Sequence, residues 1–136
     1  MYKSWIVGIE TFQCSLYIPN ISFPFCYNER FIISKKIFIK NINSCFGNKD
    51  FTDYIKDDNI LMIVGLQTNF CIDATVKSAF ERGYKVIVPQ GANSTFDNEY
   101  MTGEETYKYY NDMMWPKRFA TCVSVDEAIK LMESKS

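Results

Sequence analysis

Histidine is absent from the 136 residues of this chain. Without it, neither a Ser-His-Asp triad nor a Cys-His pair can form, and no metal can be bound through an imidazole nitrogen. Any general base must be a lysine, a carboxylate, a tyrosine or a cysteine. The five cysteines are odd in number and show no CxxC pair or other metal-ligand spacing. This pattern is typical of separate, reduced thiols rather than of a disulfide framework or a zinc site.

Strong charge and long apolar runs are also missing. The chain has 15 basic and 16 acidic residues, so its formal net charge is −1, which favours neither nucleic acid nor an anionic membrane as a partner. No apolar stretch approaches the ~20 residues of a membrane span. Glu10 interrupts the N-terminal apolar stretch before a signal-peptide core could form. We expect one soluble, cytoplasmic domain over residues 1–136 that binds neither nucleic acid nor membrane.

The most informative stretch is residues 60–83. An apolar run predicts a strand over 60–64, a turn follows at 65–68, and an amphipathic helix begins at Cys71 and ends at Gly83. A helix N-terminus carries about half a positive charge, so a thiol placed there ionises more readily than one elsewhere. Cys71 is therefore a candidate nucleophile. The alternative is a small core residue on a helix face, because free cysteine is among the most buried residue types.

Strands and helices are predicted to alternate from Ile37 onward. The expected strands are Ile37–Ile39, Ile60–Val64, Tyr84–Pro89 and Phe119–Val123, and the expected helices are 50–57, 71–82, a helix from Thr102 to about Trp115, and one opened by Ser124. This alternation predicts an α/β fold with a parallel sheet, and the continuous apolar run at 60–64 favours helices on both of its faces. Ligands bind beyond the carboxyl ends of such strands, where Lys40 and Cys71 both lie.

Four stretches resemble the isochorismatase-like cysteine hydrolases, a family that includes nicotinamidases and related amidases. They are Lys40-x-x-x-Ser44-Cys45-Phe46, Val64–Cys71, Thr75-x-x-x-Ala79-x-x-x-Gly83-Tyr84-x-Val86 and Ala92–Thr95. The resemblance implies a Rossmann-like three-layer fold. It covers a family-matching core over residues 36–136 and leaves an N-terminal segment, residues 1–35, that matches poorly.

The resemblance also implies roles for individual residues. Cys71 matches the family's nucleophile, and Lys40 matches its catalytic lysine, although a solvated lysine at a strand end is the alternative. Leu66 and Gln67 fall where many members have a cis peptide bond, and the backbone N–H groups of Gln67 and Cys71 would form an oxyanion hole. The implied reaction is hydrolysis of a small amide, and we expect no metal or other cofactor.

The chain departs from the family pattern where an aspartate ends the family's first strand, because no aspartate precedes Lys40. In one interpretation residues 6–10 are a degraded first strand, and Glu10 is a substitute acid. In the other, which the sequence favours, Trp5–Glu10 is a loop, and the first strand and helix are missing because 39 residues are too few to hold them. The bare sheet edge that remains would favour homo-oligomers.

Three functions are compatible with these observations. The first is an amidase-type hydrolase, which needs an acid to protonate the leaving amine and would be weak without one. The second is a shortened, catalytically weak or inactive relative with a structural role or none. The third is a redox-sensing protein that uses an activated Cys71 thiol without hydrolysis. The sequence leaves open whether the chain is an enzyme.

Overall fold

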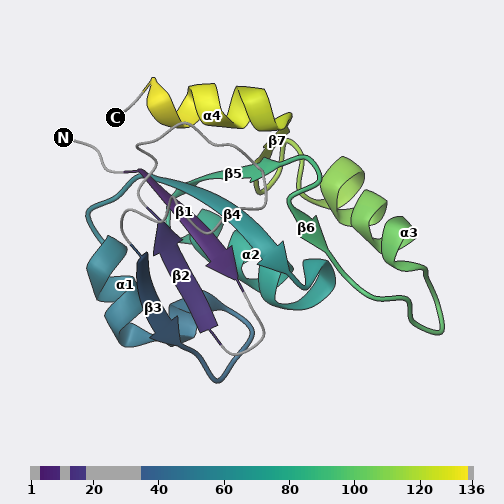
Figure 1. Ribbon diagram of the computed structural model, residues 1–136, viewed down its shortest axis with the longest axis horizontal. Coiled ribbons are helices and arrows are strands. Elements are labelled where there is room, and N and C mark those ends of the chain that lie inside the picture. The colour runs from purple at the N-terminus through teal and green to yellow at the C-terminus, as the bar shows by residue number, and fades with distance from the viewer. Residues whose placement is uncertain (1–3, 10–12, 18–34, 135–136) are drawn as a thin grey trace.

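A mixed β-sheet runs through the middle of the molecule (Figure 1). The computed structural model describes residues 4–9, 13–17 and 35–134. The sheet order is β3-β2-β1-β4-β5-β7, and the short β6 pairs with β4. The strands are β1 (Ser4–Ile9), β2 (Gln13–Tyr17), β3 (Lys35–Ile39), β4 (Ile60–Leu66), β5 (Lys85–Pro89), β6 (Asn93–Ser94) and β7 (Thr121–Val123). All neighbouring pairs are parallel except those of β2, which is antiparallel to both β1 and β3.

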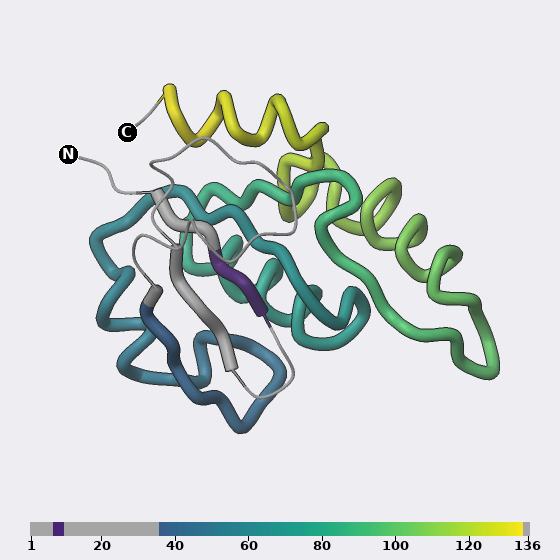
Figure 2. Tube along the Cα trace, viewed as in Figure 1, coloured from purple at the N-terminus to yellow at the C-terminus, as the bar shows by residue number. Residues whose placement is uncertain are grey.

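Helices alternate with the strands from β3 onward, which confirms the predicted order. They are α1 (Lys49–Ile55), α2 (Asp73–Glu81), α3 (Gly103–Lys108) and α4 (Val125–Glu133), with three shorter segments, η1 (Cys45–Gly47), η2 (Thr68–Ile72) and η3 (Tyr109–Met114). Figure 2 shows β3 and α1, in blue, on one side of the central strands, and α3, in green, on the opposite side. No helix in the described part of the chain is both long and apolar enough to span a membrane.

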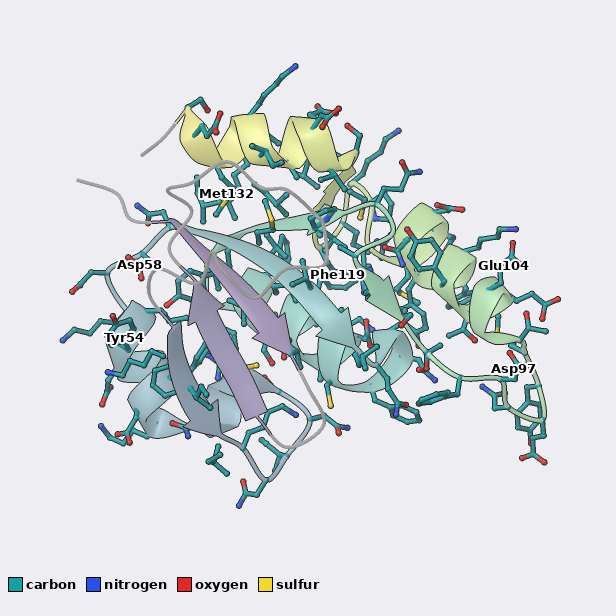
Figure 3. All side chains as sticks on the ribbon, in the orientation of Figure 1. Tyr54, Asp58, Asp97, Glu104, Phe119 and Met132 are labelled. Carbon is teal, nitrogen blue, oxygen red and sulfur yellow. The ribbon has the colours of Figure 1, made fainter. Side chains whose placement is uncertain are left out.

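Both faces of β4 are buried, which explains why its sequence shows no alternation. Leu61 and Ile63 belong to the larger core cluster, which also contains residues of α1 and α2. Ile60 and Met62 point to the other face and pack with α4, whose Met132 faces the sheet in Figure 3. The prediction of a sheet covered by helices on both faces is therefore confirmed.

The N-terminal strand corrects the interpretation that the sequence favoured. Ser4–Ile9 is not a loop but the strand β1, which pairs with β4 in parallel from Ser4 opposite Ile60 to Ile9 opposite Gly65. Only residues 10–12 separate β1 from β2, and the two strands are antiparallel. An antiparallel pair needs only a short connection, whereas a parallel pair needs a crossover, usually a helix. A first strand therefore fits into this short segment, because a connection of three residues is long enough to join it to β2.

The last strand is shorter than predicted. A strand was expected over Phe119–Val123, but β7 begins only at Thr121. The backbone N–H groups of Arg118, Phe119 and Ala120 all donate to the carbonyl oxygen of Trp115. Residues 118–120 therefore form a tight turn after η3, and their N–H groups are not available to pair with β5.

We expect the chain to self-associate through β3, which is an outer strand of the sheet. Its Ile37 and Ile39 side chains are 48% and 69% exposed, and an exposed apolar edge strand favours pairing with another chain. Sedimentation velocity over a concentration series should show the native chain associating and the double variant Ile37→Lys, Ile39→Lys shifted towards monomer. Ile42→Lys is the matched control, because Ile42 is 56% exposed but lies outside the strand. A native chain that stays monomeric at every concentration would contradict this expectation.

Candidate active site

Cys71 lies near the start of a helix that follows the carboxyl end of β4. The helix begins three residues earlier than predicted, at Thr68, with Gln67 as its N-cap. The reason is a wide first turn of π-helix, in which the Ile72 N–H donates to the Gln67 carbonyl and the Asp73 N–H donates to that of Thr68. This turn continues directly into α2. The Cys71 side chain is buried but sits within the first turn, where the helix dipole favours negative charge.

Lys40 follows β3 and reaches Cys71, 31 positions further along the chain. Its Nζ atom is 3.3 Å from the Cys71 Sγ atom and donates a second hydrogen bond, also of 3.3 Å, to the Ile42 carbonyl oxygen. Lys40 is only 3% exposed, so the alternative of a solvated lysine is wrong. A buried ammonium group is costly unless it is paired. The Lys40 ammonium group lies beside Sγ and can therefore stabilise a negative charge on that atom.

The loop after Lys40 is attached to α2 on the same side as Cys71. The backbone N–H of Cys45 donates to the Thr75 Oγ1 atom over 3.1 Å, and the Asn43 Oδ1 atom lies 3.8 Å from Cys71 Sγ. Sequence reasoning missed both Asn43 and Thr75 as contributors to the site. The available signal was the spacing of Cys71 and Thr75, because residues four apart share a helix face.

The Leu66–Gln67 peptide bond is cis, as the family resemblance implied. It joins β4 to the first turn of the helix, and the Gln67 carbonyl accepts hydrogen bonds from the N–H groups of Phe70 and Ile72. The structure thus places Leu66 at the end of β4, Gln67 at the N-cap of the helix and Cys71 in its first turn. The oxyanion role of the Gln67 and Cys71 N–H groups stays a prediction.

A network of buried polar side chains holds the first turn of this helix in place. The Thr68 Oγ1 atom donates to the Asn93 Oδ1 atom over 2.8 Å, and the Asn93 and Asn111 amides exchange two hydrogen bonds of 2.9 and 3.0 Å. All three residues are buried, so each polar atom must find a partner within the protein. The network therefore joins η2, β6 and η3, and no local sequence pattern indicated it.

Glu10 lies outside the described residues. It follows Ile9, the last residue of β1, which pairs with Gly65 near the carboxyl end of β4. In the described part of the chain, no group of three or more histidine, cysteine, aspartate or glutamate side chains is arranged to hold a metal ion.

We expect iodoacetamide to label Cys71 faster than Cys122 near pH 7. Burial, with a smaller contribution from the Asp112 carboxylate, raises the pKa of the Cys122 thiol to about 11. A raised pKa leaves very little thiolate at neutral pH, and only the thiolate reacts. Cys71 has the Lys40 ammonium beside its sulfur atom instead. Peptide mass spectrometry after timed labelling measures both rates, and faster labelling of Cys122 would refute this expectation.

Comparison with known proteins agrees with this geometry. Residues 29–127, more than half of the chain, match the family model of the Isochorismatase domain. The chain belongs to the isochorismatase family. It is similar to an uncharacterized isochorismatase family protein, YddQ, from Bacillus subtilis (strain 168), with 33% identity over 61 residues that cover 43% of this chain and 34% of the relative.

Solved structures of the family show the same fold. A putative isochorismatase hydrolase from Oleispira antarctica has 25% identity and a TM-score of 0.61, with 67% of this chain and 51% of that chain covered. The nicotinamidase PncA from Bacillus subtilis has 20% identity and a TM-score of 0.50, with 62% and 45% covered. The chain thus spans between about a third and a half of the length of these relatives.

Proposed function

We propose that this chain is a cysteine hydrolase that cleaves the C–N bond of a small amide. Cys71 is the nucleophile, and Lys40 stabilises its thiolate. The observation that carries the proposal is the contact of 3.3 Å between Lys40 Nζ and Cys71 Sγ, with both residues buried at the carboxyl edge of the sheet. Family membership supports hydrolysis, and the fold shared with a nicotinamidase supports an amide as the substrate.

The proposed reaction has two halves. The Cys71 thiolate attacks the amide carbonyl carbon, and the N–H groups of Gln67 and Cys71 stabilise the oxyanion. The C–N bond then breaks, the amine leaves with a proton, and a thioester remains on Cys71. Water hydrolyses this thioester, releases the carboxylic acid and restores the thiol.

We propose Glu10 as the acid that the first half requires. An amine is a poor leaving group unless a nearby acid protonates it, and histidine is absent from the chain. The support for Glu10 is the register of β1, whose Ile9 pairs with Gly65, the residue before the Leu66–Gln67 peptide bond. The sequence led us to expect weak hydrolysis because the family's acid was not found, and Glu10, which directly follows β1 in the chain, is our candidate for that acid.

Ammonia release from a panel of small primary amides, including nicotinamide, tests the proposal. Turnover should be lost in Cys71→Ala and should fall by about 10²–10⁴-fold in Glu10→Gln. Cys122→Ala is the matched control and should retain turnover, because Cys122 lies in β7, away from Lys40. No ammonia from any amide would refute the hydrolase. Turnover that survives in Glu10→Gln would refute only the assignment of the acid.

The second candidate is a shortened relative without hydrolase activity. The observation in its favour is that no aspartate precedes Lys40, where the family pattern has its catalytic acid. A reactive Cys71 combined with no ammonia release would favour this candidate or a redox-sensing thiol. In either case we keep the expectations of a homo-oligomer and a cytoplasmic location as proposals.

A further inference from the structure

We infer that Asn43 is a third functional group of the Cys71 site, and that its side-chain amide stabilises the thiolate by donating a hydrogen bond to Sγ. This inference rests on the proposed function in taking Cys71 as the nucleophile. Asn43 lies three residues after Lys40, on an exposed loop, and its Oδ1 atom is 3.8 Å from Cys71 Sγ. Two residues of one loop thus contact the same sulfur atom.

The attachment of the loop to α2 explains why Asn43 lies there. The N–H of Cys45 is fixed to the Thr75 hydroxyl, four residues after Cys71 on the same helix. Four helical residues rise about 6 Å along the axis, and two extended residues span about 6.6 Å. Ser44 is extended, with φ −72° and ψ 137°. Once Cys45 is fixed over Thr75, Asn43 therefore lies over Cys71.

The amide of Asn43 suits either protonation state of the sulfur. When Cys71 is a thiol, its S–H group can donate to Oδ1, which lies 3.8 Å from Sγ. When the proton leaves, a half-turn of the amide brings the Nδ2 donor to the same place, where it can donate to the thiolate. Asparagine has no ionisable proton, so it stabilises the anion without neutralising it. The proton must therefore go to another group, for which a carboxyl group is suited.

The charged residues beside Cys71 include Lys40 and Asp73. Lys40 supplies the positive charge at Sγ. The two oxygens of the Asp73 carboxylate, in the first turn of α2, are bound by Trp115 Nε1 at 2.8 Å and by Lys77 Nζ at 2.9 Å. Cys45 is fully buried beside the helix, and Glu10 lies outside the described residues. Asn43 thus contributes an uncharged side chain to a sulfur atom that also contacts the charged Lys40.

The test is the rate of Cys71 alkylation by iodoacetamide between pH 5 and 10. We expect Asn43→Asp to slow labelling at pH 7 about tenfold and to move the profile to higher pH, because a carboxylate repels the thiolate. Asn43→Ala should slow it about threefold through loss of the donor. Asn41→Asp is the matched control, with the same charge change two residues earlier in the exposed loop, and should label nearly as the native chain does.

Two results would overturn the inference. The first is alkylation of Cys71 at the rate of the native chain in both Asn43 variants. The second is an equal decrease of that rate in Asn41→Asp and Asn43→Asp, which would indicate a general effect of the added negative charge. Thermal unfolding of each variant shows whether the fold is retained, and Asn43→Ala serves if Asn43→Asp does not fold. The assay needs no amide turnover, so failure of the proposed hydrolase would not be mistaken for failure of this inference.

Discussion

Gly65→Ala is expected to lower the free energy of unfolding by about 4 kcal/mol or more, a larger loss than most single substitutions cause. Gly65 has a φ of +122°, which L side chains rarely adopt. An added Cβ atom would lie 2.1 Å from the carbonyl oxygen of Ile9 and 2.8 Å from its nitrogen. These are backbone atoms of the adjacent strand and cannot rotate away. The pairing of β1 with β4 would have to open.

Gly83→Ala separates the steric clash from backbone strain. Gly83 also has a positive φ, +87°, but an added Cβ atom would meet nothing within 4 Å. The Gly83→Ala substitution should lower the free energy of unfolding by only about 1–2 kcal/mol, the strain of an L residue in the left-handed region. Chemical denaturation followed by circular dichroism measures both variants. Equal losses for the two glycines would show that β1 and β4 do not approach as closely as described. The Gly65→Ala variant should also lose Cys71 reactivity, because Gly65 lies near the end of β4, which leads into the helical turn that carries Cys71.

Lys40→Met is expected to slow the alkylation of Cys71 at pH 7 by at least tenfold. A positive charge within about 4 Å favours the charged form of a thiol, because the ammonium attracts the thiolate, and the thiolate is the form that reacts. Methionine matches the length of the lysine stem and is suited to the buried position, so the fold should be retained. Timed iodoacetamide labelling with peptide mass spectrometry measures the rate.

Lys36→Met is the matched control for this result. Lys36 lies in β3, the strand that Lys40 follows, but it is exposed, and its Nζ atom lies 4.0 Å from the centre of the Tyr54 ring. Its loss should leave Cys71 labelling unchanged. If Lys40→Met also labels at the native rate, the ammonium does not stabilise the thiolate, and the proposed site loses its main support.

The alkylation rate of Cys71 and the release of ammonia from an amide test different properties of this site. A hydrolase and a redox-sensing protein both need a stabilised Cys71 thiolate, so the Lys40→Met result supports either. Only the hydrolase also needs a group that protonates the leaving amine. Ammonia release with the Glu10→Gln comparison therefore separates the two functions, whereas labelling alone does not.

The elements with local signals were predicted from the sequence. The alternation of strands and helices from β3 onward follows from apolar periodicity, and the start of α3 follows from the capping box of Thr102 and Glu105, which the structure contains. Cys71 and Lys40 could be chosen because each follows a predicted strand, and the carboxyl ends of strands that run in the same direction lie at one edge of the sheet.

Pairings between distant segments were decided only by the tertiary structure. The sequence was compatible with Ser4–Ile9 as a loop or as a strand, and in the structure it is a strand paired with β4. This pairing needs a glycine at position 65, because a Cβ atom there would clash with the backbone of Ile9. Asn43 meets Cys71 because Cys45 is fixed to Thr75, 30 residues away. Hydrogen bonds and close packing between remote residues leave no periodic trace in the sequence, because each depends on where the rest of the fold brings its partner. For this chain the sequence therefore determined the α/β alternation and the candidate nucleophile, and the tertiary structure decided what surrounds that cysteine.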